Sequence, residues 1–159
     1  MTMETIAFAD DDERSLERSS ATVPDPGPLE VQVEIKAAGI CGSDVGAWQR
    51  KPAYDFIETP RIPGHEHVGV ISELGADIEH FNLGDRVVER PLRSCGVCDA
   101  CRNGAPHVCE SLEITGFHSD GGFAPYSVVP AHSLHQVPDS LTDHQAAVAE
   151  PMAVAARAT

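Results

Sequence analysis

Four of the five cysteines lie close together, with the spacing Cys95-x2-Cys98-x2-Cys101-x7-Cys109. Thiolates at such short separations can bind one metal ion, and four of them complete the tetrahedral coordination of a structural zinc site. The alternatives are an iron–sulfur cluster and four reduced thiols without a ligand. Nothing near the cluster suggests electron transfer, and such clusters rarely occur in a reducing compartment without a metal. The spacing therefore predicts structural zinc.

A second group of possible ligands lies upstream, where Cys41 precedes the pair His65–Glu66. Taken alone, Cys41 is typical of a small buried hydrophobe and His65 of a turn residue. Together the three supply a thiolate, an imidazole and a carboxylate, a mixed set that binds zinc with one position left open. Ser43 places a hydroxyl where a zinc-bound alcohol can pass on its proton. Zinc would lower the pKa of that alcohol and favour loss of a hydride, so the group predicts a catalytic zinc site.

The composition limits the classes of protein to which this chain can belong. Its 159 residues leave room for one domain with a sizeable core, and 25 acidic against 11 basic residues give a net charge of −14. Such a surface disfavours nucleic acids and anionic membranes, because both bind clustered Lys and Arg. The lysines are Lys36 and Lys51 alone. This scarcity suggests a halophilic source, in which salt screens the repulsion between carboxylates.

The sequence contains no apolar run long enough to cross a bilayer. Its first residues, Met1–Thr5, lack the basic start and the apolar stretch of a secretory signal. We therefore expect a cytoplasmic protein without a membrane partner, in which clustered cysteines are reduced and free to bind metal.

The elements that must hold these ligands are mostly short strands. Apolar residues alternate with polar ones at Val31, Val33 and Ile35, which is typical of a half-buried strand. The acidic run from Asp10 to Ser20 is expected to be a solvated loop or an edge hairpin. Further strands are expected at 5–9 and 68–74, after the turn at Gly84, and again at 121–129, with an irregular cysteine lobe at about 91–110. Many short strands separated by Gly and Pro favour a β-barrel over a layered α/β fold.

The last part of the sequence has a different character. Residues 142–159 are rich in alanine, and Thr142 is a plausible N-cap, so this segment is expected to be helical. Pro151 should break or restart the helix. We expect a domain over residues 1–141, followed by a helical segment that leads towards a missing dinucleotide-binding domain.

Six motifs of this sequence, in their order along the chain, resemble those of the zinc-containing medium-chain dehydrogenases. Within that family the chain looks most similar to the polyol and sugar branch, which includes sorbitol dehydrogenase. Threonine dehydrogenases are nearby. The resemblance covers the chain from about Ile6 onward. The motifs are Gly39-Ile-Cys-Gly-Ser-Asp44, Pro63-Gly-His-Glu66, Gly84-Asp-Arg-Val87, the four-cysteine lobe, Asp120-Gly-Gly-Phe-Ala-Pro-Tyr126 and Glu150-Pro151.

The resemblance implies a mainly β fold, a partly open GroES-like barrel with a zinc-binding lobe, and two zinc ions per chain. Cys41 and His65 match catalytic zinc ligands, and Glu66 matches a carboxylate that ligates the zinc or swings onto it. Glu150 matches the acid that completes the site directly or through the metal-bound water, and Ser43 the first member of a proton relay. The structural zinc falls to Cys95, Cys98, Cys101 and Cys109.

Two positions depart from the family pattern. Relatives often have a histidine where this chain has Gly46, which bears on the proton route, and another where it has Arg157, which bears on the domain junction. The sequence also contains no Gly-x-Gly-x-x-Gly turn, so the main NAD(P)-binding half is expected to be absent.

Two readings of function follow. The first is the catalytic domain of a zinc-dependent dehydrogenase that transfers hydride from a small alcohol, polyol or sugar to NAD or NADP. It would be inactive without its Rossmann domain, and the complete enzyme would be a homo-oligomer. A threonine dehydrogenase-like enzyme is the alternative reaction. The second reading is a non-catalytic zinc-binding β-domain or a split subunit.

Overall fold

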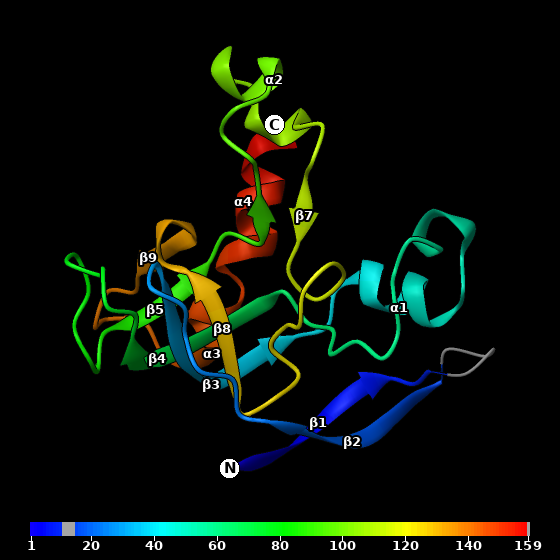
Figure 1. Cartoon of the computed structure of the whole chain (residues 1–159), viewed down its shortest axis with the longest axis horizontal. Coiled ribbons are helices and arrows are strands. Elements are labelled where there is room, and N and C mark those ends of the chain that lie inside the picture. The colour runs from blue at the N-terminus through cyan, green and yellow to red at the C-terminus, as the bar shows by residue number, and fades with distance from the viewer. Residues whose placement is uncertain (11–14, 159) are drawn as a thin grey trace.

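The computed structural model describes residues 1–10 and 15–158, and it is built around one antiparallel sheet with the strand order β8-β3-β4-β5-β9 (Figure 1). The fold is mainly β, as expected. The strands of this sheet are β3 (Glu30–Gly39), β4 (Glu66–Leu74), β5 (Arg86–Glu89), β8 (Tyr126–Pro130) and β9 (Leu134–Gln136).

The alternating residues of β3 form the centre of the largest apolar core. Val31 and Val33 are fully buried, and they pack with Ile71, Val87 and Val129 from the neighbouring strands. Aliphatic side chains dominate this core because the sequence has few aromatic residues. The period-two pattern therefore identified both the strand and its buried face correctly.

The pairing of β3 with β4 brings the first candidate site together. Gly39, the last residue of β3, lies opposite Glu66, the first residue of β4. Cys41 follows β3 by two residues and His65 immediately precedes β4. Two segments that are distant in the sequence are thus fixed side by side by the register of one antiparallel ladder.

A two-stranded hairpin, β1 (Thr2–Phe8) with β2 (Leu16–Thr22), packs beside the sheet. Its buried residues Met3 and Ala7 contact Ile62. Much of the acidic run expected as a loop or edge hairpin belongs to this hairpin, although residues 11–14 lie outside the described part of the chain.

The cysteine lobe extends from the sheet on two short strands, β6 (Leu92–Arg93) and β7 (Glu113–Ile114). These pair only at Leu92–Ile114 and Arg93–Glu113. Between them lie the one-turn helix α2 (Asp99–Arg102) and a 3₁₀ turn, η2 (Pro106–Val108). The expected irregular lobe at about 91–110 is therefore present, and it contains little regular structure.

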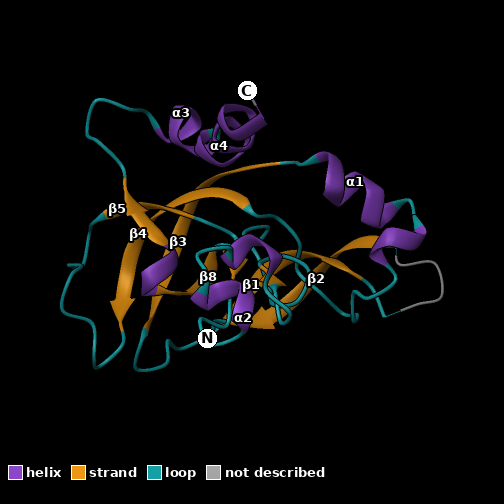
Figure 2. Cartoon of the chain, turned by 90° about the horizontal axis from the view of Figure 1, so that it is seen from above, coloured by secondary structure: helices purple, strands orange, loops and turns teal. Residues whose placement is uncertain are grey.

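The C-terminal segment forms two helices, α3 (Asp143–Ala147) and α4 (Ala149–Ala158), which lie together on one side of β3, β4 and β5 (Figure 2). Thr142 caps α3, because the Gln145 amide donates to its hydroxyl at 3.3 Å and the Gln145 side chain accepts from the Thr142 amide at 2.9 Å. Ala146 packs on Val68 of β4.

Pro151 falls in the first turn of α4, where its missing N–H leaves no intrahelical bond unmade, so a new helix begins around it as expected.

Thr159 lies outside the described residues, and the domain boundary at residue 141 stays a prediction. Among the described residues, no helix is long and apolar enough to span a membrane. The remaining helical elements are α1 (Gly42–Trp48), η1 (Pro52–Tyr54) and η3 (Ala131–Ser133).

Candidate metal centres

Cys41, His65 and Glu66 form the first cluster of possible metal ligands. One donor atom from each lies within 4.8 Å of the others. His65 and Glu66 are buried, and Cys41 is half-buried at the N-terminus of α1. The structure thus brings together a thiolate, an imidazole and a carboxylate, which is the donor set that suits zinc with an open position.

Two glycines next to the cluster have no room for a side chain. A Cβ on Gly39 would lie 2.4 Å from Oε2 of Glu66, so a side chain there would displace the carboxylate. Gly64 has a φ of +96°, and a Cβ on it would lie 2.4 Å from the ring of Phe123. The sequence motif needs glycine before His65 because the backbone turns there through the left-handed region.

Asp44 holds two of the three ligands in place. Its Oδ2 accepts a hydrogen bond from the Cys41 amide at 2.9 Å, as an acidic residue in the first turn of a helix can. Its Oδ1 lies 3.6 Å from Nδ1 of His65, and neither of these two buried atoms has another hydrogen-bond partner. Burial raises the pKa of Asp44, while the Cys41 amide and the nearby His65 oppose that rise.

The other nitrogen of His65 faces Ser43, whose Oγ lies 3.4 Å from Nε2. The ring is therefore oriented from both sides, with Nδ1 towards a carboxylate and Nε2 towards the hydroxyl. Carboxylate–histidine pairs of this kind fix the tautomer of metal-binding imidazoles. Sequence reasoning missed the role of Asp44, although an acid three residues after a helix-starting Cys41 was a readable signal.

Aromatic rings enclose one side of the cluster. Phe117 is 4% exposed and meets the His65 ring edge-to-face, with centroids 5.5 Å apart. Tyr54 meets the same phenylalanine edge-to-face at 5.7 Å. Trp48, at the end of α1, is 53% exposed. Phe117 is therefore buried against a candidate ligand, whereas Trp48 is exposed.

Tyr54 fills the space beside Gly46. A Cβ on Gly46 would lie 2.6 Å from Cε2 of the tyrosine ring and 3.3 Å from its hydroxyl. Position 46 is three residues after Ser43 on α1, so the two share one face of the helix. The departure from the family pattern at Gly46 is therefore accompanied by a phenol ring in the space that a side chain would use.

Replacing Gly46 by Ala is expected to destabilise the fold by about 1–3 kcal/mol, because the added methyl group overpacks against the Tyr54 ring. Chemical denaturation of both proteins measures the change. The double variant Gly46→Ala/Tyr54→Ala serves as the control, since it removes the clash, and its loss should be smaller than the sum of the single losses. Additive losses would show that the two side chains do not compete for space.

Glu150 and Arg157 lie on α4, outside the three-residue cluster. Burial raises the pKa of Glu150, and the charges on His65 and Glu66 also act on this carboxyl group, so it is near the cluster. Both α4 residues line a mostly apolar cavity of about 450 Å³ between β5 and α4.

The four cysteines of the lobe form the second cluster, with all four sulfur atoms within 4.8 Å of one another. The Sγ atoms of Cys95 and Cys101 are 4.0 Å apart, and those of Cys98 and Cys109 are 3.9 Å apart. Zinc–sulfur bonds of about 2.3 Å in a tetrahedron require sulfur–sulfur distances of about 3.8 Å. The arrangement therefore fits a four-thiolate zinc site.

Backbone amides prepare these sulfurs to carry negative charge. The Cys98 amide donates to Sγ of Cys95 at 3.4 Å, and the Ser111 amide donates to Sγ of Cys109 at 3.3 Å. Hydrogen bonds from the Val97 and Cys98 amides hold the pKa of Cys95 at about 6. Desolvation raises the pKa of Cys101 to about 12, so metal binding must displace the proton of that thiol.

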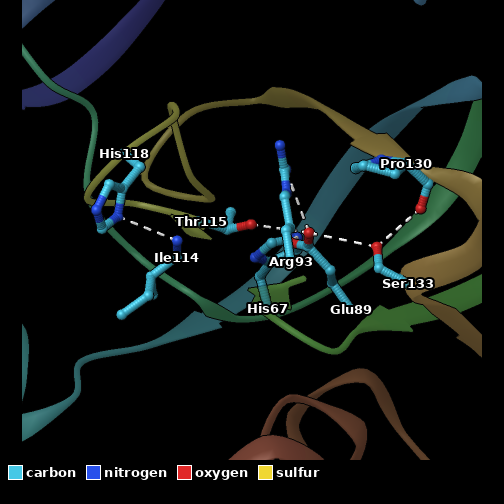
Figure 3. Close-up of polar contacts among 8 residues, drawn as sticks. All are labelled: His67, Glu89, Arg93, Ile114, Thr115, His118, Pro130 and Ser133. Atoms are coloured by element: carbon cyan, nitrogen blue, oxygen red, sulfur yellow. Dashed lines mark hydrogen bonds and ion pairs between the residues drawn. The ribbon is translucent and has the colours of Figure 1, made fainter. Parts of the chain in front are cut away.

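A buried polar network, which sequence reasoning also missed, brings together residues from β4, from β5 and from the base of the cysteine lobe (Figure 3). Its centre is Glu89 at the end of β5, whose side chain is 0% exposed. Hydrogen bonds join this carboxylate to Arg93, Thr115 and Ser133, and Nε2 of His67 is packed 3.7 Å from its Oε2. Burial lowers the pKa of His67. No motif reveals the network, because its five members come from five separate segments.

A mainly β domain with a mixed-ligand cluster and a four-thiolate lobe has the donor sets of a zinc-binding domain. The family model of the alcohol dehydrogenase GroES-like domain matches residues 27–139. The chain belongs to this family, and the expected relationship to the zinc-containing medium-chain dehydrogenases is confirmed.

Individual relatives agree with this membership. The chain is 42% identical to the starvation-sensing protein RspB of Escherichia coli K12 over 137 residues, which are 86% of this chain and 40% of that protein. It is 38% identical to L-threonine 3-dehydrogenase of Deinococcus deserti over 130 residues, 81% of this chain and 38% of that enzyme. The chain thus spans about 40% of the length of these curated relatives.

A solved structure gives the same fold. The alcohol dehydrogenase rspB from E. coli CFT073, complexed with its cofactor NADH, superposes with a TM-score of 0.87 and 38% sequence identity. The match covers 98% of this chain and 44% of that one.

Proposed function

We propose that the protein is a zinc-dependent dehydrogenase that oxidises a small alcohol, polyol or sugar by hydride transfer to NAD or NADP. The observation that carries this proposal is the convergence of Cys41, His65 and Glu66 within 4.8 Å, from two segments of the chain. The second support is Asp44, whose unpartnered Oδ1 faces the unpartnered Nδ1 of His65 and leaves Nε2 for a metal.

Zinc bound there supplies a Lewis acid for an alcohol oxygen. The residues of the chain supply the rest. Ser43 lies on the Nε2 side of His65 at 3.4 Å, so its hydroxyl is placed to accept the proton that leaves the alcohol. Phe117 covers one side of the imidazole and keeps water from it. Glu66 is proposed as the carboxylate ligand because it belongs to the cluster, and Glu150 as an acid beside it.

The nicotinamide cofactor is proposed to bind largely outside residues 1–159. The sequence contains no Gly-x-Gly-x-x-Gly turn, and the rspB relative that binds NADH is a longer chain. A dinucleotide-binding domain from further residues, or from a second chain, would complete the site. We expect the complete enzyme to be a cytoplasmic homo-oligomer and residues 1–159 alone to show no turnover.

The second candidate reaction is oxidation of L-threonine, since a relative with 38% identity is an L-threonine 3-dehydrogenase. L-Threonine carries a secondary alcohol, as polyols and sugars do, so the same metal cluster suits either reaction. A non-catalytic zinc domain is the third possibility, and it predicts a metal in the lobe without one at Cys41.

Metal analysis of the complete protein tests the proposal. We expect two zinc ions per chain in the parent protein and one in Cys41→Ser, because that variant loses a ligand. Ser43→Ala is the matched control and should keep two, since Ser43 is not a ligand. Turnover should then be compared for polyols, sugars and L-threonine with NAD and with NADP. One zinc in the parent protein, located in the lobe, would overturn the catalytic assignment.

A further inference from the structure

The carboxylate of Glu89 gathers contacts from four other segments (Figure 3). Its Oε1 accepts hydrogen bonds from the Thr115 hydroxyl at 2.8 Å and from the Arg93 guanidinium at 3.2 Å. The Ser133 hydroxyl lies 3.4 Å from the same oxygen and shares its one proton with the closer Pro130 carbonyl at 2.7 Å. Its Oε2 lies 3.7 Å from Nε2 of His67. A fully buried carboxylate needs such partners, because water cannot reach it.

Two of these partners stand at the base of the zinc lobe. Arg93 is on β6, two residues before Cys95, where the chain enters the lobe. Thr115 directly follows β7, where the chain leaves it. β6 and β7, the two arms of the lobe, pair with each other at only two positions, Leu92–Ile114 and Arg93–Glu113. The contacts of Arg93 and Thr115 to Glu89 therefore help to fix the lobe to the sheet.

A third partner belongs to the strand of the catalytic cluster. His67 is on β4, directly after Glu66, and its side chain is 1% exposed. The ring packs closely over Gly122, where a side chain would not fit, since a Cβ on that glycine would lie 2.8 Å from Nδ1. Displacement of the lobe arms therefore leaves Glu89 with fewer partners beside His67, which is costly for a buried charge.

We propose that Glu89 is a positioning residue that couples the two metal sites, so that occupation of the lobe strengthens metal binding at Cys41, His65 and Glu66. This rests on the proposed function, in which both clusters bind metal. The physical link is the network itself: an ordered lobe presents Arg93 and Thr115 to Oε1 of the carboxylate. Its Oε2 is packed 3.7 Å from the buried His67 ring at the start of β4, so a shift of the carboxylate must move that ring as well. By linkage, the catalytic-site metal must stabilise metal binding in the lobe by the same factor.

Cobalt binding to the complete protein tests the coupling. The affinity of the Cys41 cluster for Co²⁺ is measured from its thiolate–cobalt absorption, first with zinc in the lobe and then in a Cys98→Ser/Cys101→Ser background. Loss of the lobe site should weaken cobalt binding about tenfold, within the usual range of coupling between sites. With Glu89→Gln the same loss should cost less than about threefold, because the link is already broken.

Glu113→Gln is the matched control, since Glu113 is an exposed acid on β7 opposite Arg93 and should keep the full tenfold effect. If Glu89→Gln does not fold, Thr115→Val removes the shortest hydrogen bond at nearly constant shape and should reduce the effect. A general loss of stability lowers the cobalt affinity equally with and without the lobe site. Only the ratio of these two affinities therefore reports the coupling. An equal ratio in the parent protein and the Glu89 or Thr115 variant overturns the proposal, as does a ratio of one in the parent protein. Failure of the parent protein to bind a second metal overturns the proposed function as well.

Discussion

Removing zinc from the four-cysteine site is expected to unfold the lobe between residues 92 and 114 while the five-stranded sheet stays folded. The lobe has almost no core of its own: Cys109 is its buried member, whereas Val97 and Val108 are 65% and 60% exposed. Zinc binding contributes about 10–16 kcal/mol in small zinc domains, so the ion replaces the missing apolar contacts. The core of the sheet, in which Val31 and Val33 are fully buried, includes no residue of the lobe.

Hydrogen exchange before and after treatment with a chelator measures this prediction. The amides of Arg102 and Asn103, which bond to the carbonyls of Cys98 and Asp99, should lose their protection. Amides of β3 serve as the internal control and should remain protected. Continued protection of the lobe in verified zinc-free protein would mean that its backbone, rather than the metal, maintains the structure.

Asp44→Asn is expected to lower the metal affinity of the Cys41–His65–Glu66 cluster by about 10–100-fold, the usual effect of removing an outer partner of a metal-binding histidine. The amide has the shape of the carboxylate but not its charge, so it holds the proton on Nδ1 of His65 less strongly. It can also turn its NH₂ group towards Nδ1 and favour the tautomer whose proton is on Nε2, the nitrogen proposed to face the metal.

Competition with a chromophoric chelator gives the affinity of each variant for zinc. Asp143→Asn provides a matched control, because Asp143 is also in the first turn of a helix and pairs with Arg86 at 2.7 Å on the protein surface. That variant should bind zinc as tightly as the parent protein. If Asp44→Asn also binds zinc as tightly as the parent protein, the Asp44 carboxylate does not support His65 as a metal ligand.

The four-thiolate site could be predicted from the sequence because its ligands are close in the chain. A short irregular segment brings Cys95, Cys98 and Cys101 together without help from distant elements, so spacing alone predicts the geometry. The strands were equally readable, since burial on one face imposes the alternation seen at Val31 and Val33. The halophilic source and the cytoplasmic location stay predictions.

The candidate catalytic site was only partly readable. Cys41 and His65 are weak signals alone, and resemblance to a family joined them. Their approach in space depends on the register in which Gly39 faces Glu66. A shift of one residue in that ladder would turn the side chains of β4 to the other face of the sheet, and no local pattern fixes it uniquely.

The sequence by itself determined which residues are candidate metal ligands, the division of its cysteines into two groups, the mainly β class and the family. Only the tertiary structure decided that Asp44 faces His65, that Tyr54 occupies the space beside Gly46, and that Glu89 joins the lobe to β4. The physical reason is distance along the chain. Spacing and periodicity report contacts within a few residues, whereas a buried carboxylate finds its partners wherever the packed fold brings donors together.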